Sequence, residues 1–183
     1  MLKFIEIDKN LDEAVCDFCY DSHEKMQIKD WLALDPKDEL LRIIERGRKY
    51  SVLVVDVSDN DADIKFYDPL KIKIAAVFLV NFYDLDNPDF FGYSIGMTKE
   101  ELKETAVMDI AIVGCEYRGQ GLQKKTIAAS EEKLKKAGFK YLLATIDPEN
   151  KYSLKNALES GYEIKKKVIY YTNLTRFVLL KKI

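Results

Sequence analysis

The chain has little of what several functional classes need. Its 183 residues include three cysteines and a single histidine, and the net charge at pH 7 is −2. Three cysteines in a chain of this kind are expected to be reduced thiols in a cytoplasmic protein. A net charge so close to zero gives no broad electrostatic footprint for nucleic acid. The segment around His23 has no nucleophile elbow, which argues against a Ser-His-Asp hydrolase.

Long apolar runs are also missing. No run approaches the roughly 20 residues of a membrane helix, so no membrane partner is expected. The first ten residues, MLKFIEIDKN, contain acids and no extended apolar core, which is not typical of a signal peptide. What is present is a hydrophobic content of 48%. The length suits a single domain over residues 1–183 that can bury its core without disulfides or metal.

Apolar periodicity and turn residues divide the chain into alternating elements. Helix caps are expected at Asn10 or Asp12, and Pro36 and Gly47 are expected to bound the second helix. The polar segment 58–71 reads as a long hairpin loop between two antiparallel strands. Strands are expected at residues 2–7, 51–57, 73–83, 105–113, 140–146, 162–171 and 174–182, and helices at 10–34, 36–49, 98–104, 120–137 and 147–161.

Three of the eight glycines fall within nine residues, GCEYRGQGL, at positions 114–122. This stretch lies between an expected strand and an expected helix. A helix N-terminus presents unpaired N–H groups and a partial positive charge, and glycine lets the backbone approach an anion closely. The stretch therefore predicts a site for phosphate.

Two well-known phosphate loops do not fit this stretch. The dinucleotide fingerprint G-x-G-x-x-G, started at Gly119, would have its third glycine at Lys124. The P-loop G-x-x-x-x-G-K-[ST], started at Gly114, would require Lys and Ser or Thr where Gln120 and Gly121 stand.

A third pattern fits. Residues 116–121, Glu-Tyr-Arg-Gly-Gln-Gly, resemble motif A of the GNAT superfamily of acyl-CoA-dependent N-acyltransferases, [QR]-x-x-G-x-[GA]. The commoner form V-x-P-x-x-R-G-x-G is similar to residues 113–121. Two positions depart from the family pattern: Glu116 replaces Gln or Arg, and Cys115 replaces Pro. Because the main phosphate contacts in this family come from backbone N–H groups, we expect binding to survive both changes.

A second stretch resembles a later motif of the same family. In DPENKYSLKNALESGY, residues Asn150, Ser153, Gly161 and Tyr162 occupy the places of N-x-x-[SA]-x(7)-G-[FY]. The resemblance covers roughly residues 100–165, and the first half of the chain adds no motif. The family implies an α/β fold, in the order β-α-α-β-β-β-α-β-α-β-β, with a central mixed, splayed sheet flanked by helices.

The resemblance also implies a co-substrate, acetyl-CoA, and no metal. Its pyrophosphate would lie on backbone N–H groups of the glycine turn, and its pantetheine arm would lie in the gap between the strands at 105–113 and 140–146. The acceptor would be an amine-bearing small molecule or peptide, and the enzyme a monomer or homodimer. The residues implied in cofactor binding are Ile112, Val113, Arg118, Gly119, Gln120, Gly121, Leu122, Gln123, Asn150 and Ser153.

Asp109 is the candidate general base. An amine is mostly protonated at neutral pH, so a base must take its proton, and family members often place an acid on this strand. Alternation predicts that Asp109 shares a side with Val107, Ala111 and Val113. The competing interpretation is a position at the sheet margin, where the carboxylate would be solvated or bonded to backbone.

The general acid is not assigned. The family's usual tyrosine position, seven residues after the asparagine, holds Ala157. Tyr93, Tyr152 and Tyr170 are possible substitutes that the sequence does not rank.

Two further patterns are weaker. Cys16, Cys19 and His23 share a helical face but form an incomplete zinc set, and Cys packs as a small hydrophobe among apolar neighbours. The loop at 84–104 combines acids with aromatics, including Phe90 and Phe91, which suits a cationic amine but suits an ordinary acidic loop better.

Two other functions stay open. The fold could bind acyl-CoA as a sensor or binding module without efficient turnover, which Ala157 and Glu116 favour. It could also be an interaction domain that binds no CoA.

Overall fold

The computed structural model describes residues 1–57, 72–170 and 173–183. Seven strands form one mixed sheet in the order β1-β2-β3-β4-β5-β7-β6. The strands are β1 (Leu2–Ile5), β2 (Val52–Asp56), β3 (Lys73–Asn81), β4 (Thr105–Val113), β5 (Tyr141–Ile146), β6 (Glu163–Tyr170) and β7 (Leu174–Lys182). The helices are α1 (Asp12–Glu24), α2 (Lys37–Gly47), α3 (Phe91–Ser94), α4 (Lys99–Lys103), α5 (Leu122–Lys136) and α6 (Lys151–Glu159).

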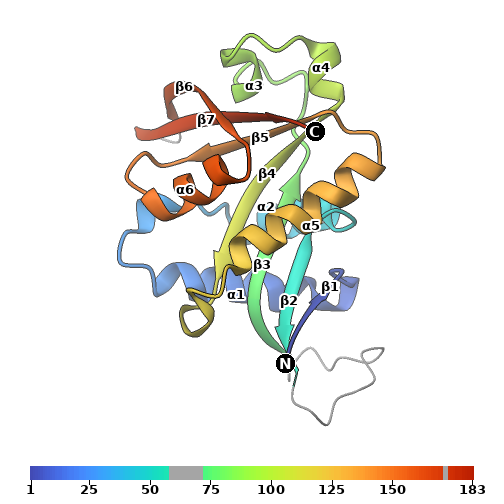
Figure 1. Cartoon of the computed structure of the whole chain (residues 1–183), viewed down its shortest axis with the longest axis vertical. Helices are drawn as coiled ribbons and strands as arrows, with labels where there is room; N and C mark the ends of the chain where they lie inside the picture. The colour runs from blue at the N-terminus through green and yellow to red at the C-terminus, as the bar shows by residue number, and fades with distance from the viewer. Residues whose placement is uncertain (58–71, 171–172) are drawn as a thin grey trace.

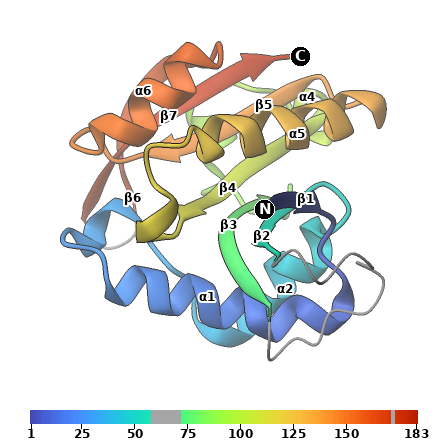
Figure 2. The same cartoon turned by 60° about the horizontal axis from the view of Figure 1, so that its bottom comes forward.

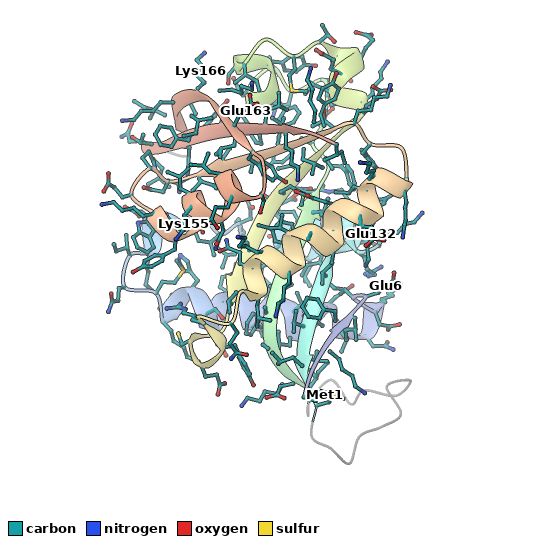
Figure 3. All side chains as sticks on the ribbon, viewed as in Figure 1. Met1, Glu6, Glu132, Lys155, Glu163 and Lys166 are labelled. Atoms are coloured by element: carbon teal, nitrogen blue, oxygen red, sulfur yellow. The ribbon has the colours of Figure 1, made fainter. Side chains whose placement is uncertain are left out.

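Helices cover both faces of this sheet (Figures 1 and 2). On one face, α1 and α2 bury a core with alternate residues of β2, β3 and β4, including Leu53, Leu79 and Ile110. On the other face, α5 and α6 pack over Phe78 of β3 and Leu142 of β5. Charged side chains of α5, α6 and β6, labelled in Figure 3, are exposed to solvent. The expected element order and the α/β class with a mixed sheet are confirmed.

The sheet opens between β4 and β5, its one parallel pair among the described strands. The two strands pair only from Thr105 to Val107 against Tyr141 to Leu143. Beyond Val107, β4 continues to Val113 beside β3, while β5 continues beside β7 to Ile146. The expected splay is therefore present, and it widens toward the glycine turn.

The first expected helix is wrong in its length and its cap. Asp8 caps a preceding 3₁₀ turn by accepting from the Asn10 N–H at 2.9 Å, and α1 ends at Glu24. The segment between α1 and α2 is held by Arg176 of β7. There the buried Arg176 donates to the Asp30 carbonyl at 2.6 Å and to the Asp147 carboxylate at 2.9 Å.

Gly47 is the last residue of α2, as expected, and the structure shows a packing constraint at this position that the sequence did not indicate. A Cβ at this position would lie 1.6 Å from the Val80 carbonyl oxygen, so α2 approaches the backbone of β3 more closely than any side chain allows. Pro36 precedes the first helical residue, Lys37. The expected loop at 58–71 lies outside the described residues, although β2 and β3 are antiparallel as expected.

The loop after β3 contains a feature that the sequence did not indicate. Residues 91–94 form the short helix α3, in which Phe91 is buried, and Phe90 before it is buried as well. Both pack with Val107, Leu143 and other apolar residues of β4, β5 and β7. They are core residues rather than the aromatic walls of an amine site.

Candidate functional site

The glycine turn between β4 and α5 contains a buried tyrosine that packs against the sheet. Tyr117 packs with Val54, Ala75 and Leu122, and its hydroxyl donates to the Asp56 carboxylate at 2.9 Å. Lys73 lies over the Tyr117 ring at 5.3 Å and pairs with Glu116 at 3.2 Å. Glu116 is therefore paired with Lys73 of β3 at the surface, where both side chains are exposed.

Two glycines give the turn its backbone shape. Gly119 has φ +79° and Gly121 has φ +70°, the left-handed region that L side chains rarely adopt. Gly121 is the N-cap of α5, and the first helical bond runs from the Lys125 N–H to the Gly121 carbonyl. The N–H groups of Leu122, Gln123 and Lys124 precede that bond and have no partner within the helix.

The charges at helix starts distinguish α5 and α6 from α1, α2 and α4. The first turns of α1, α2 and α4 each carry two acids, the usual complement to the helix dipole. Neither α5 nor α6 has an acid in its first turn. The first turn of α5 instead carries Lys124 and Lys125. Lys124 pairs with Glu159 of α6 at 2.7 Å, so acids lie nearby, but none is in either first turn, where a bound anion would complement the helix dipole.

Side-chain hydrogen bonds join the starts of these two helices. Gln123 donates through Nε2 to the Ser153 hydroxyl at 3.1 Å and accepts from the Asn156 amide at 2.6 Å. Asn150 caps α6 by accepting from the Ser153 N–H at 3.1 Å. The structure thus brings Gln123 to Asn150 and Ser153, although Ser153 follows it by 30 residues in the sequence.

A hollow of about 280 Å³ lies beside the turn, between it and α1. Phe18 and Val113 contribute apolar walls, and Lys25 and Arg118 contribute positive charge. Asp21 and Glu116 also line it, so the hollow is mixed in charge. Arg118 and Gln120 are exposed in the turn, and the Arg118 Nε donates to the Val113 carbonyl at 3.5 Å.

Asp109 lies at a β-bulge in the middle of β4. Leu79 and Val80 of β3 pair with Ile110 and Met108, so Asp109 is the extra residue in its strand. The bulge resets the alternation, and the expected grouping was partly wrong. Ala111 packs in the α5–α6 core and Val113 beside Leu122, whereas Ile110 and Ile112 face α1 and α2.

Asp109 is partly buried and hydrogen-bonded. Its Oδ2 accepts from the Asn81 amide at 2.9 Å. Burial raises the pKa of Asp109 to about 7, with the Asn81 hydrogen bond acting in the opposite direction. The competing interpretation placed this carboxylate at the sheet margin, whereas it lies partly buried in the middle of β4 with a side-chain partner. A carboxyl that titrates near neutrality can accept a proton under physiological conditions.

The tyrosines considered as general acids occupy different surroundings. The hydroxyl of Tyr93 donates to the Leu85 carbonyl at 2.6 Å. Tyr152 is 77% exposed on α6, with its ring 6.4 Å from that of Trp31. Tyr170 is half-buried, 6.2 Å from the Phe91 ring, and Ala157 is buried within α6. The geometry does not select one of them.

Cys16 and Cys19 are both fully buried in the core between α1 and the sheet. Burial raises the pKa of each thiol, so neither is poised as a thiolate. Within the described ranges, no group of three or more His, Cys, Asp or Glu side chains is placed to hold a metal ion. In the same part of the chain, no helix is long and apolar enough to cross a membrane.

Sequence reasoning missed Asn81 and Arg46. Asn81 is 3% exposed, and its Oδ1 accepts from the Arg46 guanidinium at 3.3 Å. One signal was available, because Asn81 is the polar residue in the otherwise apolar run of β3, as Asp109 is in β4. Nothing in the sequence showed that the two would meet.

Comparison with known proteins identifies the architecture. Neither the known family models nor the curated proteins contain a match to this sequence. Many solved structures do match its fold. A mosquito arylalkylamine N-acetyltransferase-like protein is 15% identical with a TM-score of 0.70, and the match covers 100% of both chains.

Two further matches were solved with a cofactor. A chain of the NatC complex bound to Gag peptide and CoA is 12% identical with a TM-score of 0.70, over 100% of this chain and 98% of that one. A protein from Salmonella typhimurium described as a putative acetyltransferase, solved with acetyl-CoA, is 13% identical with a TM-score of 0.66, over 100% of this chain and 94% of that one. The chain therefore has the GNAT acetyltransferase fold, which confirms the resemblance at the level of architecture.

Proposed function

We propose that this chain is a GNAT-superfamily N-acetyltransferase that transfers an acetyl group from acetyl-CoA to a primary amine of an unidentified acceptor. The observation that carries the proposal is the early end of β4–β5 pairing at Val107, followed by an acid-free helix start at Gly121. A strand gap that leads to an anion site suits a ligand with an extended arm and a phosphate end. The shared fold supports the same function.

In this proposal, the pyrophosphate of acetyl-CoA accepts from the N–H groups of the turn and of the start of α5. The pantetheine arm lies in the gap and pairs with the free edge of β4 at Ile112 and Val113. The start of α6 borders the arm on the β5 side. The residues assigned to the cofactor are Ile112, Val113, Arg118, Gly119, Gln120, Gly121, Leu122, Gln123, Asn150 and Ser153.

The acceptor reacts as a neutral amine. The nitrogen of the neutral amine attacks the thioester carbonyl carbon, and Asp109 takes the proton that this nitrogen loses, directly or through water. A backbone N–H of the opened β4 edge stabilises the oxyanion. The C–S bond then breaks, the acetyl group stays on the nitrogen, and the leaving thiolate takes a proton from Asp109 or from water. A base with a pKa near 7 is suited to both proton transfers.

A second function has one observation in its favour. Ala157, which is buried, occupies the usual tyrosine position of the family. An acyl-CoA sensor or binding module of the same fold would need no acid there. That protein would bind acetyl-CoA but release no thiol with any amine.

The test combines a melting experiment with a turnover assay. Acetyl-CoA at ~100 times its dissociation constant stabilises a protein by about 2.7 kcal/mol, so the melting temperature should rise by several degrees. Thiol release should then be measured with a panel of small amines and peptides. Stabilisation with turnover supports the acetyltransferase, stabilisation without turnover on a broad panel supports the binding module, and no stabilisation by acetyl-CoA, propionyl-CoA or CoA contradicts both.

A further inference from the structure

Asn81, the last residue of β3, is a buried amide whose hydrogen bonds join three elements. Its Nδ2 donates to the Asp109 Oδ2 on β4 at 2.9 Å. Its Oδ1 accepts from the Phe82 N–H at 2.8 Å and from the Arg46 guanidinium on α2 at 3.3 Å. Arg46 is itself held by Glu39 on the same helix at 2.8 Å.

These contacts permit one orientation of the amide. Arg46 and the Phe82 N–H are both donors, so the oxygen of Asn81 must face them and the NH₂ group must face Asp109. The close approach of α2 to β3 at Gly47 brings Arg46, the preceding residue, beside this amide. The bond to Asn81 uses one of the two acceptor sites of the Asp109 Oδ2, so Oδ1 is the less engaged of the two oxygens with respect to this amide.

We propose that Asn81, held in place by Arg46, is the positioning residue for Asp109, fixing its Oδ2 and presenting its Oδ1 to the acceptor amine. The proposal rests on the proposed function, in which Asp109 is the base. It assigns a role to α2 and to the end of β3, neither of which carries a motif.

The charges around Asp109 explain why a fixed donor matters there. Burial and the carboxylate of Asp35 favour the protonated form of Asp109, whereas Arg46 and the Asn81 amide favour the ionised form. Glu39 offsets part of the Arg46 charge. Without the amide, Asp109 would remain protonated at neutral pH and could not act as a base.

The test is a pH titration of the Asp109 carboxyl in the protein without ligand, in which carbon NMR monitors the carboxyl carbon. Asn81→Leu keeps the approximate volume and removes the donor. Its Asp109 midpoint should rise by about one to two pH units, because a hydrogen bond to a charged group is lost. The acidic limb of the pH–rate profile for acetyl transfer should move by the same amount.

Ser51→Ala is the matched control. Ser51 is buried beside Asn81 and joins the same two elements, since its hydroxyl donates to the Gly47 carbonyl and accepts from the Val80 N–H, both at 3.0 Å. This variant should lose stability without moving the Asp109 midpoint. An unchanged midpoint in a folded Asn81→Leu protein, or an equal shift in Ser51→Ala, would overturn the proposal.

Arg46→Met keeps the test decisive if Asn81→Leu does not fold. The Arg46 side chain is 43% exposed, so the protein should tolerate its loss. The amide loses its anchor and the positive charge disappears, so the Asp109 midpoint should rise by a fraction of a pH unit; no rise would contradict the proposal. These titrations need neither cofactor nor acceptor, so a failure of acetyl-CoA binding would refute the proposed function separately.

Discussion

The glycine turn and the surroundings of Asp109 belong to the same strand, yet they are built in different ways. The turn depends on local backbone, namely two glycines with positive φ at the start of a helix. The surroundings of Asp109 depend on β3, β4, α2 and the segment before α2, which contribute Asn81, Arg46 and Asp35. A local device leaves a motif in the sequence, whereas one assembled from distant elements does not.

The comparison also separates two chemical tasks. The turn offers neutral N–H groups and nearby lysines, which suit a bound anion that does not change during the reaction. Asp109 lies in a desolvated position that makes its charge costly, which suits a group that must exchange a proton. Variants of the two regions should therefore fail in different measurements.

The largest expected effect is on turnover. Asp109→Asn keeps nearly the same shape but cannot accept a proton, so the rate of acetyl transfer should fall by about 10²–10⁴-fold. The affinity for acetyl-CoA, measured by calorimetry, should stay unchanged. In the unmodified protein the rate should fall as the pH drops below about 7, because protonated Asp109 is inactive.

A wild-type rate in a folded, CoA-binding Asp109→Asn protein would remove Asp109 from the mechanism. A loss of acetyl-CoA affinity in Asp109→Asn as large as its loss of rate would show that the glycine turn and Asp109 do not have separate tasks.

The next effect is on stability. The pKa of Asp109 is raised from its ordinary value of 3.8 to about 7, so the folded state binds a proton that the unfolded state releases between these values. The free energy of unfolding should therefore decrease as the pH rises from about 4 to 7 and stay level above 7. Asp109→Asn lacks this ionisation, so at pH 8 it should be more stable than the unmodified protein by about 2–4 kcal/mol.

Denaturant unfolding at pH 4, 6 and 8 checks this difference. The two proteins should have similar stability at pH 4, with the gap opening as the pH rises. A gap that is constant with pH would show that Asp109 has an ordinary pKa in the folded protein.

The sequence predicted the features that depend on neighbouring residues and missed those that depend on distant elements. Strand β4 and the glycine turn could be predicted because apolar runs, glycines and caps act over a few residues. The bulge at Asp109 could not, because it depends on pairing with Leu79 and Val80. For the same reason alternation placed Ala111 on the wrong face.

The helices show the same limit. The apolar periodicity of residues 10–34 predicts one helix that runs past Glu24, where α1 ends. The residues beyond Glu24 instead include Asp30, whose carbonyl accepts from Arg176, a residue far away in the sequence. The acids and aromatics of loop 84–104 suggest an amine site or, better, an ordinary surface loop, whereas Phe90 and Phe91 are buried at a helix of only four residues that leaves little periodic signal. Gly47 was correctly placed at a helix end, but its reason, contact with Val80, lies in another element.

The central claim is that the glycine turn binds acetyl-CoA, and calorimetric titration of two matched variants tests it most directly. Gly121→Asp places a carboxylate at the start of α5, while Gly138→Asp places one just beyond its end. Both glycines have positive φ, +70° and +90°, and a Cβ at either would meet nothing within 4 Å, so the backbone strain is alike. The account predicts at least a ~100-fold loss of acetyl-CoA affinity in Gly121→Asp, since juxtaposed like charges cost several kcal/mol, and near-normal affinity in Gly138→Asp. Equal affinity in the two folded variants would contradict it.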